Sequence, residues 1–166
     1  AIMAICSWIS VSAGPVPFTL QTFAVFVTAA LLGTKRGTIA VVVYILLGII
    51  GVPVFAGLTG GPSVIAGPTG GFIVGFILTA IIIGLLMNLA NGKSEVVKLV
   101  ITVVAMVLGD VACFAIGTVW FMVVTNNTVA VALTYCVIPY IIPDIAKIVV
   151  ATIIANRVKK YVQIFN

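Results

Sequence analysis

The sequence predicts an all-α integral membrane protein with six transmembrane helices. Of its 166 residues, 63% are hydrophobic and only 7% are charged, whereas a soluble domain carries about 25% charged residues. The mean hydropathy is +1.42, so polar groups are too few to cover a folded surface in water. Because a helix needs about 20 residues to cross a hydrocarbon core of about 30 Å, six crossings fit the chain and leave residues for connections.

Apolar runs between breaking residues place these helices. The stretch Ala1–Val11 is apolar but only half as long as a span, and Gly14 and Pro15 stop it. We therefore expect a first helix that begins upstream of Ala1 and ends near Val11. The other five are expected at Thr22–Gly33, Thr38–Gly51, Gly70–Leu89, Val97–Val124 and Pro143–Val162, in one membrane domain over residues 1–166.

The basic residues predict how the helices are oriented. Seven of the eight fall in two alternate connections and the C-terminal tail: Lys35, Arg36, Lys93, Lys98, Arg157, Lys159 and Lys160. The other connections, 12–21, 52–69 and 125–142, contain no charged residue. Because basic residues collect on the cytoplasmic side of a membrane, we expect both termini in the cytoplasm and the charge-free loops outside.

The outer connections are rich in Gly and Pro, as in residues 14–17 and 57–62. Irregular backbone cannot face lipid, so it must fold over the protein or line a cavity. A lid that caps an outward-facing binding pocket is one such use, and solvated turns are the alternative. Gly67, Gly71 and Gly75 recur every four residues and predict a smooth face for close helix packing.

Three charged residues lie inside expected spans: Asp110, Asp144 and Lys147. Ionisable side chains within a membrane are costly and indicate a functional site. Lys147 lies ten residues outward of Arg157, or about 15 Å, and Asp110 twelve residues outward of Lys98, or about 18 Å. All three therefore share the outer layer. Asp144 and Lys147, three residues apart, lie on one helix face, where they form either a polar binding site or only a stabilising ion pair.

Other residue counts exclude several functions. The chain has no His, which removes serine-protease triads, HExxH zinc sites and His proton relays. Cys6, Cys113 and Cys136 are too far apart in sequence to suggest a metal or redox motif. The net charge of +5 is explained by membrane topology and requires no nucleic acid. Residues 92–94 (GKS) imitate the end of a phosphate-binding loop, but Met87 occupies the position five residues before Gly92 where such a loop requires glycine. We expect no enzyme activity and no cofactor.

Six motifs follow one another along nearly the whole chain: residues 14–22 (GPVPFTLQT), 31–37 (LLGTKRG), 51–55 (GVPVF), 67–72 (GPTGGF), 117–120 (GTVW) and 143–147 (PDIAK). Together they resemble the BioY family, the biotin-binding S components of energy-coupling factor (ECF) transporters. The resemblance implies a six-helix subunit in the prokaryotic cytoplasmic membrane that captures biotin from outside. Its partners would be a transmembrane coupling subunit and two ATPase subunits, which alone use ATP.

The family pattern also implies a site. Asp144 and Lys147 match the polar pair of the last helix that contacts biotin, and the segments around Gln21 and at 69–71 match loops that close the pocket. Biotin carries a ureido ring, an apolar thioether ring and a carboxylate, which suit one acid, one ammonium, an amide and aromatic walls. The candidate ligand-binding residues are Asp144, Lys147, Gln21, Thr19, Phe18, Phe55, Thr69, Gly70, Gly71 and Tyr140, with Phe72 as a further wall residue.

Other functions remain open at this point. The chain could be an S component for another vitamin such as thiamine or riboflavin, although only Trp8 and Trp120 offer large indole surfaces. It could also be a structural or adaptor membrane protein in which Asp144 and Lys147 only pair, or a carrier that works without ATPases. Asp110 could be a counter-ion to Lys147, a protonated acid between helices, or a ligand contact.

Overall fold

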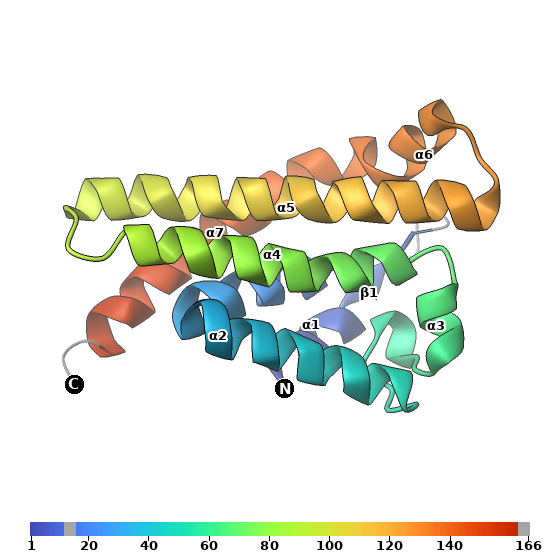
Figure 1. Ribbon diagram of the computed structural model, residues 1–166, viewed down its shortest axis with the longest axis horizontal. Coiled ribbons are helices and arrows are strands. Elements are labelled where there is room, and N and C mark those ends of the chain that lie inside the picture. Colours follow the sequence, from blue (N-terminus) through green and yellow to red (C-terminus); the bar gives the residue numbers. More distant parts are fainter. Residues whose placement is uncertain (12–15, 163–166) are drawn as a thin grey trace.

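The computed structural model (Figure 1) describes residues 1–11 and 16–162, with side chains as far as residue 159. Long helices lie side by side along the molecule, and shorter elements gather at one end. Two short antiparallel strands pair Ser10 with Thr19 and Val11 with Phe18. The elements are α1 (Ile2–Trp8), β1 (Ser10–Val11), β2 (Phe18–Thr19), α2 (Gln21–Ile49), η1 (Ala56–Leu58), α3 (Pro62–Ala66), α4 (Gly70–Leu89), α5 (Glu95–Thr125), α6 (Val129–Cys136), η2 (Ile138–Tyr140) and α7 (Ile141–Val162).

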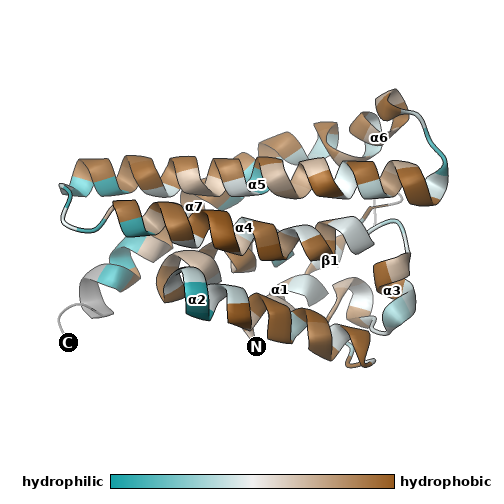
Figure 2. Ribbon diagram, in the orientation of Figure 1, coloured by the Kyte–Doolittle hydropathy of each residue, from teal (hydrophilic) through white to brown (hydrophobic). Residues whose placement is uncertain are grey.

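The outward surface of the helices is apolar. Hydrophobic side chains such as Ile142 (80% exposed) and Val123 (72%) point away from the protein, and hydrophobic residues cover the long helices in Figure 2. Such a surface needs lipid around it. Four segments are long and apolar enough to cross a membrane: Gln21–Ile49, Gly70–Leu89, Glu95–Thr125 and Val129–Lys159.

The first of these segments reverses direction at Gly33. This residue has φ 72° and ψ −175°, a conformation open essentially only to glycine. A Cβ at Gly37 would lie 3.0 Å from the Cα of Ala29, although eight residues span about 12 Å in a continuous helix. Residues 21–32 and 34–49 are therefore two helices folded back on each other. The break falls at Gly33, where the sequence predicts it. Residues 34–37, which were expected to form a loop, are helical because Gly33 alone makes the turn.

The other boundaries follow the prediction in the spans and depart from it between them. α4 has the predicted bounds, α5 is slightly longer than expected, and α7 begins two residues before Pro143. Proline is tolerated there because its missing N–H lies in the unbonded first turn. The first helix was predicted to reach Val11, but α1 ends at Trp8, because the chain then pairs with β2.

The outer connections are more ordered than the expected loops. Residues 52–69 contain η1 and α3, and residues 125–142 contain α6 and η2. The second of these connections is apolar enough to build a small core of its own, in which Ala132 and Cys136 pack against Val16 and Phe121. Residues 12–15, including Gly14 and Pro15 of the expected lid, lie outside the described residues.

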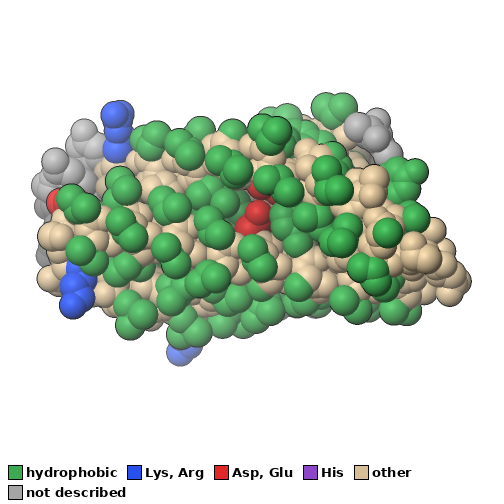
Figure 3. Space-filling view, turned by 90° about the horizontal axis from the view of Figure 1, so that it is seen from above, with side chains coloured by type: hydrophobic (Ala, Val, Ile, Leu, Met, Phe, Trp, Pro, Cys, Tyr) green, Lys and Arg blue, Asp and Glu red, His purple; other side chains and the backbone are tan. Residues whose placement is uncertain are grey.

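Basic residues from three separate segments gather at one end of the molecule, opposite the short elements and away from Lys147. Arg36, Lys98 and Lys159 line a common cleft, so the turn of α2, the start of α5 and the end of α7 meet there. In Figure 3 the visible Lys and Arg side chains lie toward one end, while acidic side-chain atoms appear midway along the molecule among hydrophobic ones. The alternation of charged and charge-free connections thus corresponds to two ends of the fold.

Small residues let the central helices approach closely. A side chain at Gly71 would overlap Trp120, and one at Gly75 would lie 3.1 Å from the Sγ of Cys113. Both contacts join α4 to α5, as the four-residue glycine spacing predicts. Thr79 reinforces them, because its hydroxyl donates to the carbonyl of Gly109 at 2.8 Å.

Candidate binding site

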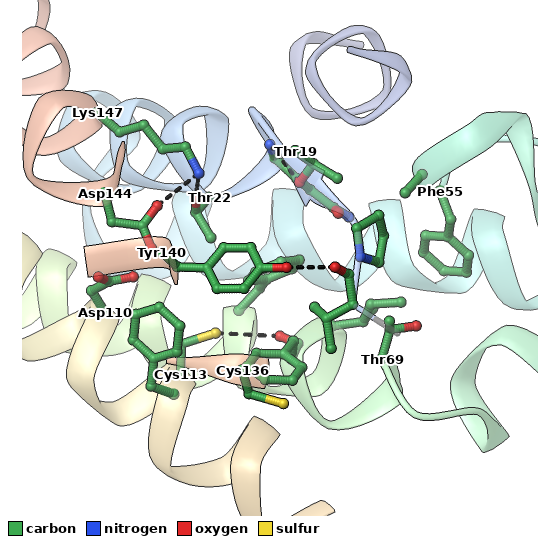
Figure 4. Close-up of a pocket in the computed structure, with 18 of the residues that line it drawn as sticks. Thr19, Thr22, Phe55, Thr69, Asp110, Cys113, Cys136, Tyr140, Asp144 and Lys147 are labelled. Atoms are coloured by element: carbon green, nitrogen blue, oxygen red, sulfur yellow. Dashed lines mark hydrogen bonds and ion pairs between the residues drawn. The ribbon is translucent and has the colours of Figure 1, made fainter. Parts of the chain in front are cut away.

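A cavity of about 190 Å³ lies where the short elements cover the ends of the long helices (Figure 4). It is mostly apolar, with a few polar groups on one side, as is typical of small-molecule sites. Strand β2, η1, α3, α6 and η2 supply one part of its wall, and α2, α4, α5 and α7 the other. Its lining residues are Val16, Pro17, Thr19, Gln21, Thr22, Phe55, Ala56, Thr59, Val64, Thr69, Phe72, Ile73, Phe76, Asp110, Cys113, Phe114, Cys136, Tyr140, Asp144 and Lys147.

A buried ion pair forms the polar side of this cavity. Nζ of Lys147 donates to Oδ1 of Asp144 at 2.7 Å, and the two side chains are only 7% and 4% exposed. The ammonium also donates to the hydroxyl of Thr22 at 3.0 Å and lies 4.5 Å from the ring centre of Phe18. Carboxylate, hydroxyl and aromatic face together replace the water that a buried ammonium loses.

The first turn of α7 positions this pair. Asp144 lies in that turn, where the helix dipole favours a negative charge. Residues three apart share a helix face, so Lys147 reaches the same side of α7. From the other side, strand β2 and the start of α2 bring Phe18 and Thr22 toward the ammonium. The site therefore forms only where residues 18–22 meet the first turn of α7.

Aromatic rings make the apolar wall. Phe18 and Tyr140 stack with ring centres 6.3 Å apart, Tyr140 contacts Phe114 at 6.4 Å, and Phe114 meets Phe72 edge to face at 6.3 Å. The hydroxyl of Tyr140 donates to the carbonyl of Val16. This bond ties η2 to the segment before β2, so that the two outer connections cover the cavity together.

Gln21 anchors the connection between α2 and α4, which also covers the cavity. Its side-chain amide donates to the hydroxyl of Tyr44 at 2.5 Å, and that hydroxyl donates to the carbonyl of Val54 at 2.7 Å. Ser7 donates to the same carbonyl at 2.5 Å. This buried network holds the connection that carries Phe55 against the long helices, so the Gln21 amide has a structural partner as well as a place in the cavity wall.

Asp110 is the third charged residue of the cavity. It projects from α5 and is 8% exposed, and Figure 4 places it beside Asp144. Its carboxyl forms no hydrogen bond or ion pair with another residue among those that the structure describes. The structure brings Asp110, Asp144 and Lys147 together, because all three line the cavity.

Most of the candidate residues from the sequence come together here. Phe18 is not a lining residue, but its ring contacts the lining residues Lys147 and Tyr140. Gly70 and Gly71 also lie outside the cavity wall, because a side chain at Gly70 would overlap the backbone of Ile65 and one at Gly71 would overlap Trp120. The candidates that line the cavity are Thr19, Gln21, Phe55, Thr69, Tyr140, Asp144 and Lys147, with Phe72.

Sequence reasoning missed several residues of the site. Phe114 lies four residues after Asp110, so helical spacing on α5 could have placed it on the same face. Thr22 had no comparable signal, since its contact with Lys147 joins segments 125 residues apart. Cys113 was expected only to pack between helices. It does so, with Sγ 3.5 Å from the carbonyl of Phe72, and it also lines the cavity.

The fold and the site define a multi-pass α-helical membrane protein that encloses a small cavity with a buried ion pair. The BioY family profile matches residues 1–164. "Biotin transporter BioY" from Thermotoga maritima is 43% identical over 160 residues, which cover 96% of this chain and 90% of the relative. "Probable biotin transporter BioY" from Pyrococcus horikoshii is 38% identical over 159 residues, with coverage of 96% and 90%.

A solved structure agrees with these relatives. The crystal structure of the S-component for biotin from an ECF-type ABC transporter matches with a TM-score of 0.84 at 26% identity, over 95% of this chain and 85% of that chain. The chain belongs to the BioY family. Because this is a family of transporters, the expectation that the chain is not an enzyme is confirmed.

Proposed function

We propose that the chain captures biotin and carries it across the membrane as the substrate-binding S component of an ECF-type transporter. The observation that carries the proposal is the buried pair of Asp144 and Lys147 in the wall of an otherwise apolar cavity. An ion pair inside a membrane protein is expensive, and this one faces a space that a small polar molecule can enter. The biotin-specific names of the relatives identify the molecule.

Biotin offers groups that suit the cavity. The free oxygen of Asp144 accepts a ureido N–H, and Lys147 donates to the ureido carbonyl or to the tail carboxylate. Phe55, Phe72 and Tyr140 pack against the thioether ring. In this arrangement one ureido N–H and one oxygen of biotin have charged partners, while the apolar atoms of the bicyclic head face rings.

The proposal includes a topology and a set of partners. The chain would cross the prokaryotic cytoplasmic membrane six times, with residues 21–32 and 34–49 as separate crossings and both termini in the cytoplasm. The collection of basic residues at one end of the fold supports this orientation. A transmembrane coupling subunit and two ATPase subunits would supply the energy, and this chain would bind neither ATP nor nucleic acid and need no cofactor.

Isothermal titration of the purified chain in detergent tests the proposal. Biotin is expected to bind tightly and one to one, while thiamine and riboflavin are expected not to bind. Desthiobiotin, which keeps the ureido ring and loses the thioether, is expected to bind more weakly than biotin. A protein that elutes as a folded species and binds no biotin would contradict the proposed function.

A further inference from the structure

Asp110 is a buried carboxyl that the pair of Asp144 and Lys147 leaves without a partner. It is 92% buried in the cavity wall, and no donor from the described residues reaches it. A buried carboxylate without donors is costly, and the neutral acid avoids most of that cost. Because Asp110 lines the cavity, its carboxyl can meet a ligand group or water there, and only a proton removes its charge.

The charged groups that share the cavity with Asp110 are one acid and one cation. α7 presents Asp144 and Lys147, which are the charged residues that act on Asp110 electrostatically. The ammonium of Lys147 already has Asp144, Thr22 and the ring of Phe18 as partners. The cavity thus contains two carboxyl groups and one cation.

The remaining titratable groups of the cavity do not change this balance. Cys113 on α5, Cys136 on α6 and Tyr140 of η2 line the same space, and each is neutral in its ordinary form. α4 adds only apolar side chains, Phe72, Ile73 and Phe76, and the Gln21 and Thr22 side chains of α2 are uncharged. Two ionised carboxyl groups would give the cavity a net negative charge before a ligand with its own carboxylate arrives.

We propose that Asp110 is a third polar contact of the ligand and acts as a neutral carboxylic acid that donates its hydroxyl hydrogen to an oxygen of the ligand. This inference rests on the proposed function, because it takes biotin, an anion with carbonyl and carboxylate oxygens, as the occupant. It gives the cavity two donors, Lys147 and Asp110, and one acceptor, Asp144. It also makes Asp110 a specificity residue that admits an anionic ligand.

Biotin titrations of three proteins between pH 6 and pH 9 test this assignment. Asparagine keeps the shape and a neutral donor, so Asp110→Asn is expected to bind biotin within threefold of the wild type at pH 6. Asp110→Ala removes the donor and is expected to lose at least tenfold. As the pH rises, the wild type can lose the proton and the Asn variant cannot, so the wild-type Kd is expected to rise relative to that of Asp110→Asn; a ratio of the two Kd values that is the same at pH 6 and pH 9 would contradict the proton on Asp110.

Controls keep the result interpretable. Glu95→Gln changes an acid at the basic end of the fold and is expected to keep the wild-type pH profile. Asp110→Leu, which keeps the branched shape of the side chain without a donor, replaces the alanine variant if that protein fails to fold in detergent.

A loss of more than tenfold in Asp110→Asn at pH 6 would show that the anion is needed, and unchanged binding in the alanine or leucine variant would show that no contact exists. Either result overturns the inference while the proposed function stands. A folded wild type that binds no biotin overturns both.

Discussion

Replacing Lys147 by alanine is expected to weaken biotin binding by at least tenfold. A hydrogen bond to a charged group contributes about 1.5–3 kcal/mol, which corresponds to about 10- to 150-fold in Kd. The substitution also removes the donor that Asp144 has at 2.7 Å in a side chain only 4% exposed. Breaking a buried pair from one side costs about 3–5 kcal/mol of stability, so the melting temperature in detergent should fall as well.

The two effects are separated by companion variants. Lys147→Met keeps much of the length of the side chain, and the double variant Lys147→Met with Asp144→Asn leaves no unpaired charge. The double variant is expected to recover stability relative to Lys147→Met but not to recover biotin affinity. Titration calorimetry measures the affinity and thermal unfolding the stability. Biotin affinity within twofold of the wild type in a folded Lys147→Met protein would remove Lys147 from the site.

Three other predictions concern parts of the fold outside the binding site. Lys35→Ala and Arg36→Ala, at the end opposite the cavity, are expected to leave the biotin Kd within twofold, and a loss of binding would mean that this end reaches the ligand. Gly33→Ala forces alanine into a conformation with φ 72° and is expected to cost about 1–3 kcal/mol, read from thermal unfolding; an unchanged melting temperature would contradict the turn. Gly71→Val pushes a side chain into Trp120 and is expected to cost about 1–3 kcal/mol, so equal stability would contradict the close packing of α4 and α5.

The sequence was most informative where the bilayer constrains the chain. α4 was predicted at its observed bounds because an apolar run of one span length has few alternatives inside a membrane. The common layer of Asp110, Asp144 and Lys147 followed from helical rise alone. Both predictions use distances along single helices, which the sequence determines directly.

Contacts between distant segments were beyond this reasoning. Thr22 reaches Lys147 only because the start of α2 and the first turn of α7 meet in space. The helical form of residues 129–136 was also missed, since a short apolar stretch outside a span carries no length signal. Its burial against Phe121 is a tertiary effect. Similarly, nothing in the spacing of residues showed that Asp110 would lack a partner.

The hairpin at Gly33 gives the protein flanks of unequal height. Residues 34–49, which carry exposed apolar side chains such as Leu46, extend only about 24 Å as a helix, whereas the 31 residues of α5 extend about 46 Å. Lipid chains beside residues 34–49 must therefore shorten, while those beside α5 meet an apolar wall longer than the hydrocarbon core. Each ångström of such mismatch costs a fraction of a kcal/mol, so no upright position relaxes both flanks at once.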